Sequence, residues 1–164
     1  MACIHGAREV RKAIIDDARV DSLQAIVVWI PMLDSDERPA AEKMSATYAD
    51  VAVPQFWDGE KLLGWEVSRS FGINNRAAWD IYLFYPPDAE WTEAGLPPPE
   101  KALAQAQGGV IGIKGTLPPK GDQTHVPEWG KGLVDIVGDP SELAALLSDV
   151  AVPYVERYRA SGVP

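Results

Sequence analysis

Residues 24–30 restrict the fold of this chain more than any other segment, because after Gln24 every side chain is apolar and most are β-branched. Such a run has no polar alternation, so it predicts a strand that is buried on both faces of a sheet. Proline has no amide hydrogen for the ladder, and Pro31 therefore ends the predicted strand. A chain built around this strand is expected to cover both faces of its sheet with helices.

Helical patterns and strand patterns alternate along the chain. Ala7, Val10 and Ile14 recur at the spacing of one helix face, and they predict a helix over residues 3–17. The alternation implies crossover connections, hence an α/β fold with a mainly parallel sheet and an antiparallel edge. Further helices are expected over residues 40–48, 60–71, 100–107 and 139–150, and further strands over residues 51–57, 78–85, 109–113 and 133–137.

Proline, glycine and short polar side chains mark the connections. Pro39 suits the first turn of the helix at 40–48, and Gly72 suits the end of the next helix. Residues 86–88 predict a turn, after which residues 89–91 are expected to start the returning strand of a hairpin. The remaining signals are a candidate N-cap at Asp139 or Ser141 and expected loops at residues 96–99 and 117–132.

The bulk properties of the chain exclude several classes of protein. With 164 residues, 46% hydrophobic and 24% charged, it is expected to form one globular domain, residues 1–164. A formal net charge of −9 argues against a nucleic-acid partner, which would need clustered lysines and arginines. No apolar run approaches the roughly 20 residues that span a bilayer, and no signal-peptide pattern is visible, so no membrane partner is expected. The single cysteine excludes an internal disulfide and fits a reducing compartment, so we expect a cytoplasmic protein.

Motifs for the common cofactors are missing from the sequence. It contains no GxxxxGK[ST] phosphate loop, no GxGxxG fingerprint and no Gly-x-Ser-x-Gly elbow, so no cofactor is expected. His5 and His125 are the two histidines, and too few soft ligands surround them to predict a metal site. Asp34, Asp36 and Glu37 could bind a cation, but we favour a solvated helix entrance for this acidic turn.

Four short segments follow one another in the order found in a known superfamily. Residues 3–9 look like the second cysteine of a CxxC motif and the helix that follows it. Residues 27–33, 55–58 and 78–91 are similar to later strands and turns of the same family. Together these segments resemble the thioredoxin-like superfamily.

The resemblance implies a thioredoxin-like mixed sheet with flanking helices over residues 1–98, and a C-terminal extension over residues 99–164. In that family a strand leads into the CxxC motif, whose first thiol lies at a helix N-terminus. In this chain the first position of the motif falls immediately before Met1, and that strand is missing. Two explanations stay open: the chain is a fragment, or the first position is a selenocysteine whose codon was read as a stop.

The missing strand would be the central one, so its absence should leave apolar edges beside Val27 and Leu83. C-terminal strands or a second copy of the chain are expected to pair there, which makes a homodimer one candidate assembly. The family also carries a cis-proline before the strand that faces the motif, whereas residues 75–79 contain no proline. Trp79 and Asp80 take that place, and they are the candidate substrate-binding residues.

Cys3 is the candidate catalytic residue that the resemblance implies. As a resolving thiol it would attack a mixed disulfide or selenenyl sulfide, and as a sole thiol it would cycle with an external thiol. The expected substrate is a protein thiol or disulfide, or a peroxide. The alternative is an inert Cys3 in a non-catalytic thioredoxin-like binding or scaffold module. In that module the binding surface would come from tryptophans, with Trp57, Trp65, Trp91 and Trp129 as candidates.

Overall fold

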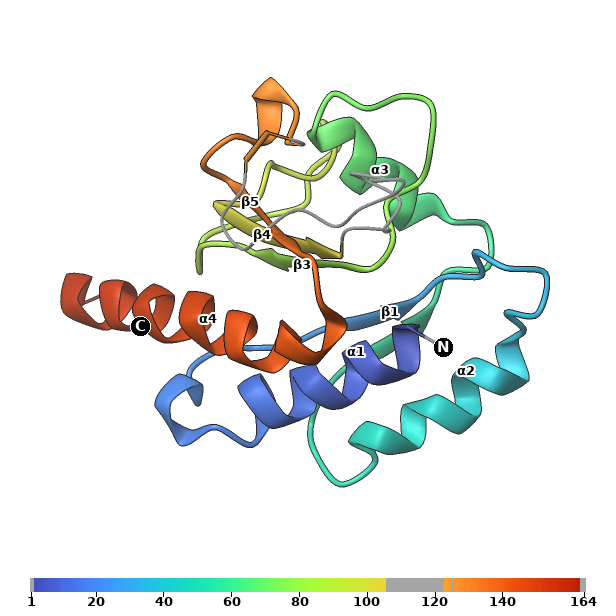
Figure 1. Ribbon diagram of the computed structural model, residues 1–164, viewed down its shortest axis with the longest axis horizontal. Coiled ribbons are helices and arrows are strands. Elements are labelled where there is room, and N and C mark those ends of the chain that lie inside the picture. The colour runs from blue at the N-terminus through green and yellow to red at the C-terminus, as the bar shows by residue number, and fades with distance from the viewer. Residues whose placement is uncertain (1, 106–122, 125, 163–164) are drawn as a thin grey trace. The chain divides into compact units, whose positions relative to one another are not determined.

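The computed structural model describes residues 2–105, 123–124 and 126–162 (Figure 1). The chain forms two compact units, one made of Met1–Lys61 and Leu143–Pro164, the other of Leu62–Glu142. Helices and strands occur in both units, which confirms the α/β class. No helix in the described part of the chain combines the length and the apolar character that crossing a membrane requires.

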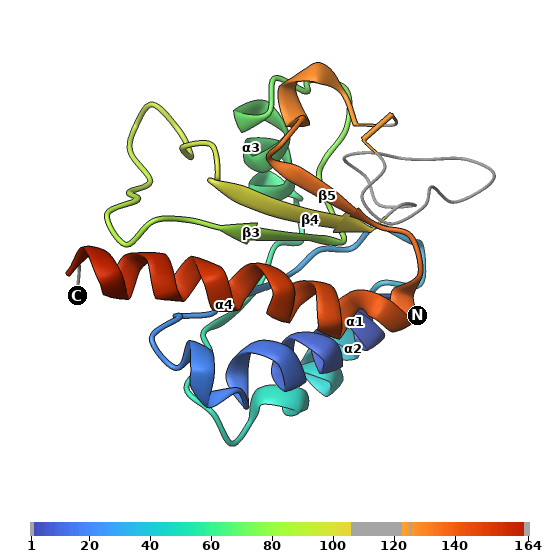
Figure 2. The same ribbon diagram turned by 60° about the vertical axis from the view of Figure 1, so that its left-hand side comes forward.

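The first unit pairs two short parallel strands, with Val28 of one opposite Phe56 of the other. A π-helical turn, Arg11–Ile15, continues its first helix. Figure 1 and Figure 2 both show the C-terminal helix running alongside this first helix and its extension. The elements are α1 (Ala2–Val10), β1 (Val27–Trp29), α2 (Arg38–Ser45), β2 (Gln55–Trp57) and α4 (Leu143–Ser161).

The sequence predicted the elements of this unit, but not all of their ends. The helix expected at 3–17 is confirmed, and so is the helix at 40–48, which has Pro39 in its first turn. The strands expected at 24–30 and 51–57 are confirmed as shorter pieces, β1 and β2. Asp139 accepts the Ser141 N–H at 2.9 Å at the start of the last helix, which then continues beyond the predicted end at Val150.

The second unit is a three-stranded sheet covered by one helix, in the strand order β3-β4-β5. The β3–β4 pair is antiparallel and the β4–β5 pair is parallel, so β3 is the antiparallel edge of this sheet. Val67 of α3 and Phe71, directly after its end, pack against the buried residues of β4 and β5. The elements are α3 (Leu62–Ser70), β3 (Ile81–Phe84), β4 (Lys101–Gln105) and β5 (Val134–Val137).

Two predicted elements of this unit are wrong. Residues 100–107 were expected to form a helix, whereas Lys101–Gln105 is the central strand β4. Alanine, leucine, lysine and glutamine are good helix formers, but pairing with a strand on each side and complete burial of Ala102 and Leu103 outweigh that preference. The returning strand of the hairpin is therefore β4, and residues 89–91 are irregular.

The other predictions for this unit are confirmed where the structure describes them. The helix expected at 60–71 is α3, and Gly72 follows it with a positive φ of 75°, as an end-cap glycine should. The strand expected at 133–137 is β5. The strand expected at 109–113, His125 and the first part of the loop at 117–132 lie outside the described residues.

Among the described residues the two sheets have four edge strands, namely β1, β2, β3 and β5. Among the described residues, β1 pairs with β2 alone, and β3 pairs with β4 alone. These are the strands that carry Val27 and Leu83, where the missing central strand was expected to leave apolar edges.

Candidate functional site

Cys3 lies in the first turn of α1. The first N–H groups of a helix have no acceptor within the helix, and together with the macrodipole they favour a negative charge at this end. Helix N-termini in general stabilise a cysteine thiolate relative to its thiol. The backbone position of Cys3 is therefore suited to an activated thiol.

His5 is oriented along the helix toward Glu9. Its Nδ1 lies 3.9 Å from a carboxylate oxygen of Glu9, one helical turn further on. The pair follows the i, i+4 spacing at which side chains of a helix are neighbours. The His5 side chain is partly exposed.

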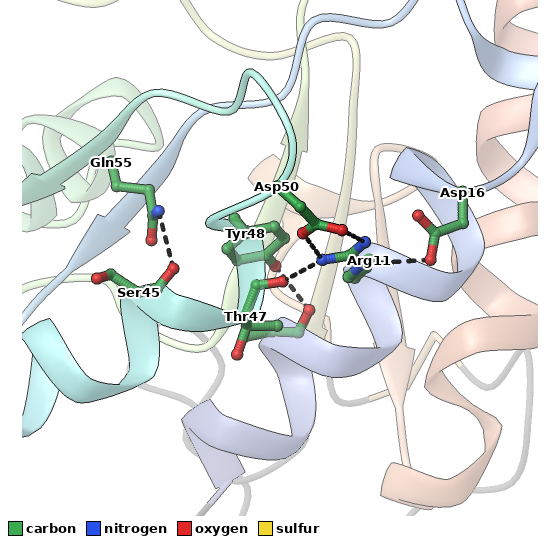
Figure 3. A network of polar contacts seen from close by, with 8 residues as sticks. Arg11, Asp16, Ser45, Thr47, Tyr48, Asp50 and Gln55 are labelled. Carbon is green, nitrogen blue, oxygen red and sulfur yellow. Dashed lines mark hydrogen bonds and ion pairs between the residues drawn. The ribbon is translucent and has the colours of Figure 1, made fainter.

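An ion-pair network fixes the end of this helix to the segment that follows α2 (Figure 3). The Arg11 guanidinium donates two hydrogen bonds to the Asp50 carboxylate, of which the Nη2–Oδ2 bond measures 2.7 Å. Arg11 also donates to the Thr47 carbonyl at 2.6 Å and to Asp16 at 3.3 Å. The hydrogen bonds from Arg11 lower the pKa of Asp50 to about 2, and those to Asp50 and Asp16 raise the pKa of Arg11.

Tyr48 attaches the same segment to the middle of α1. Its ring is 1% exposed, and its hydroxyl donates a 2.6 Å hydrogen bond to the Ala7 carbonyl. Burial raises the pKa of Tyr48 to about 12, so the hydroxyl keeps the proton that this bond requires. Tyr48 and Arg11 therefore hold α1 at two successive turns, close to where its α-helical part gives way to the π turn.

Trp79 and Asp80 immediately precede β3 in the second unit. Asp80 has a positive φ of 49°, which is uncommon for a residue other than glycine and is best tolerated by Asp and Asn. Its carbonyl accepts the Gln105 N–H at 3.0 Å, and the preceding Ala78 donates its N–H to the Gly64 carbonyl at 2.8 Å. The segment is thus fixed at once to α3 and to β4, and Trp79 and Asp80 are both half-buried.

The three candidate residues are divided between the two units. Cys3 belongs to the first unit, and Trp79 and Asp80 belong to the second. Each has a defined local backbone: a helix start for Cys3, and a fixed turn before a strand for the other two.

The acidic turn after β1 uses its central carboxylate to hold the backbone. Asp36 accepts the N–H groups of Met32 at 2.9 Å and Leu33 at 2.8 Å. This carboxylate stabilises the turn that leads into α2, which favours the helix-entrance interpretation. In the part of the chain that the structure describes, no three His, Cys, Asp or Glu side chains gather in a way that could hold a metal ion.

Two of the six tryptophans make specific contacts within their own units. Trp129 stacks on Phe71 in the second unit, with ring centroids 4.7 Å apart. Trp29 donates its indole N–H to Gln55 across the β1–β2 pair at 3.2 Å. Trp91 differs from these, because 57% of it is exposed.

The sequence did not predict the hydrogen bonds that hold α1, because Arg11 and Asp50 are 39 positions apart and no local pattern connects them. The same is true of Tyr48, whose partner is a backbone carbonyl and leaves no signal in the side chains.

No known protein family, curated protein or solved structure matches this chain.

Proposed function

We propose that this chain is a thioredoxin-like redox protein in which Cys3 is the resolving or sole thiol. The observation that carries the proposal is the position of Cys3 in the first turn of α1. That turn favours the thiolate, which is the form that attacks disulfides. Arg11 and Tyr48 hold the same helix in place, so the direction of its dipole is fixed.

The order of elements supports the family assignment. The helix that carries the cysteine is followed by the parallel pair β1–β2 and then by the antiparallel pair β3–β4. Trp79 and Asp80 stand directly before β3, where the family places the residues that border its substrate. The unusual backbone of Asp80 is the kind of local strain that clusters at functional sites.

The chemistry of a sole thiol needs a disulfide substrate and an external thiol. The Cys3 thiolate attacks one sulfur of the substrate, a new S–S bond forms, and the other sulfur leaves as a thiolate. An external thiolate then attacks the mixed disulfide at the Cys3 sulfur and releases the second substrate sulfur as a thiolate. A second external thiolate attacks the external sulfur now bound to Cys3, which releases Cys3 as the thiolate and forms the disulfide of the external thiol. The substrate is reduced by two electrons, and the external thiol is oxidised. Such a cycle depends on a supply of thiols, so we place it in the cytoplasm.

The reaction of Cys3 with oxidised glutathione tests this proposal. We expect a mixed disulfide at Cys3 to form faster at neutral pH in the folded chain than in the chain unfolded by urea. Intact-mass spectrometry measures the adduct, and Cys3→Ser is the control that should form none. A folded chain that reacts no faster than the unfolded chain would exclude an activated thiol.

A second candidate function is a non-catalytic thioredoxin-like binding module. The exposure of Trp91 favours it, because a large aromatic side chain in solvent is typical of a contact surface. The glutathione reaction separates the two functions, since a binding module has no need of an activated cysteine.

A further inference from the structure

The first turn of α1 is weak when its own sequence is considered in isolation. The helix has nine residues, and isolated helices shorter than about 12–15 residues are marginal in water. Gly6 stands in its interior, where glycine is unfavourable because it loses the most backbone freedom on folding. Contacts with the rest of the unit must therefore keep the turn around Cys3 formed.

One such contact reaches the helix at Ala7, one turn after Cys3. In an α-helix each N–H donates to the carbonyl four residues earlier, so the N–H of Ala7 closes the turn that begins at Cys3. The carbonyl of Ala7 accepts a hydrogen bond of 2.6 Å from the Tyr48 hydroxyl (Figure 3). A carbonyl oxygen has two lone pairs, so this bond can add to the helical bonds without replacing one. Tyr48 thus fixes the residue on which the turn around Cys3 closes.

The surroundings of Tyr48 keep this bond intact near neutral pH. Burial raises the pKa of Tyr48 to about 12, although the positive charge of Arg11 acts in the opposite direction. The hydroxyl therefore keeps its proton, and remains a donor, over the pH range in which thiols ionise. The bond is also buried and neutral, so salt does not screen it as it screens the exposed ion pair of Arg11 and Asp50.

We propose that Tyr48 is a positioning residue for Cys3, because it keeps the first turn of α1 closed and the closed turn stabilises the Cys3 thiolate. The N–H groups at a helix start are aligned toward an anion only while the turn is formed. Without the Tyr48 hydroxyl the turn frays, and the thiolate loses part of this stabilisation. The proposal rests on the redox function proposed above and assigns control of its thiol to a side chain outside α1.

Tyr48→Phe tests this role, and Tyr85→Phe is the matched control. Each variant removes one buried phenol oxygen, but the Tyr85 hydroxyl has no partner among the described residues. The pH dependence of Cys3 alkylation by iodoacetamide gives the pKa of the thiol in each folded chain. In Tyr48→Phe we expect this pKa to rise by about 0.5, which leaves about threefold less thiolate at pH 7. In Tyr85→Phe it should stay at the wild-type value.

This comparison isolates the turn from other influences on the thiol. His5 and Glu9 are present in all three chains, so their charges do not contribute to the difference. A general loss of stability does not move the pKa either, because the thiol is titrated in the folded chain.

Hydrogen exchange provides a measurement that needs no variant. The Ala7 amide should exchange more slowly in the folded wild-type chain than in the chain unfolded by urea, after correction for the solvent. An Ala7 amide without protection would overturn the proposal, because there would be no closed turn for Tyr48 to hold.

Two results distinguish a failure of this role from a failure of the redox function. A wild-type Cys3 with an ordinary pKa would contradict the redox function, and the role of Tyr48 would fall with it. A lowered wild-type pKa that Tyr48→Phe leaves unchanged would overturn the role of Tyr48 and leave the redox function standing.

Discussion

Arg11 and Tyr48 are the two side chains that fix the helix carrying Cys3. Arg11 is bonded to two carboxylates and a carbonyl, and Tyr48 is bonded to the carbonyl of Ala7. The first contact is solvent-exposed and ionic, whereas the second is buried and neutral. The two therefore respond differently to pH and to mutation.

The carboxyl group of Asp50 makes the stability of the fold depend on pH under acidic conditions. Its pKa falls from 3.8 to about 2 in the folded chain because it accepts hydrogen bonds from Arg11. A carboxyl with a lowered pKa stabilises the fold above its unfolded pKa, and this contribution is lost as the pH falls through the folded pKa. We expect Asp50→Asn to have a lower thermal midpoint than wild type at pH 7. Thermal unfolding followed by circular dichroism should show that difference shrinking between pH 4 and pH 2. A difference that is unchanged at pH 2 would mean that the Asp50 charge is not its source.

Tyr48 and Tyr85 form a matched pair for a second prediction. Burial raises the pKa of both to about 12, but the Tyr48 hydroxyl donates to Ala7, whereas the buried Tyr85 hydroxyl has no partner among the described residues. Tyr48→Phe should lower the free energy of unfolding by about 0.5–1.5 kcal/mol, the usual net value of such a bond. Tyr85→Phe should leave it unchanged or raise it. Urea titration measures both, and equal losses in the two variants would argue against a specific role for the Tyr48 bond.

Elements with local signals were predictable from the sequence, and elements defined by their neighbours were not. The helix face of Ala7, Val10 and Ile14 and the apolar run in β1 are visible within a few residues. β4 was missed because its residues prefer a helix in isolation, and only pairing with β3 and β5 makes them a strand. Among the candidate residues, the helix start at Cys3 was predictable, whereas the left-handed backbone of Asp80 had no signal.

The C-terminal helix α4 contains a further element-scale feature, because Pro153 stands in its interior. Proline there removes a backbone hydrogen bond and is unfavourable in a helix by about 3 kcal/mol relative to alanine. Pro153 is exposed, so its replacement loses little packing. We expect Pro153→Ala to raise the free energy of unfolding by about 1–3 kcal/mol, measured by urea titration. Glu156→Ala, at another exposed position of α4, is the control and should change stability little. A Pro153→Ala variant less stable than wild type would show that the proline is needed for the shape of the helix.

Over the whole molecule, the chain consists of two compact units, each with its own sheet among the described residues. The redox function proposed for this chain leads to one chemical requirement. Cys3 must be more acidic in the folded chain than an ordinary cysteine.

The pH dependence of Cys3 alkylation tests this requirement most directly. The rate of reaction with iodoacetamide, followed by mass spectrometry, gives the pKa of the thiol in the folded chain and in the same chain unfolded by urea. We predict a pKa near the ordinary value of about 8.5 in the unfolded chain and a clearly lower one in the folded chain, because the start of α1 stabilises the thiolate. A folded-state pKa equal to or above that of the unfolded chain would contradict the redox function and leave the binding module as the better account.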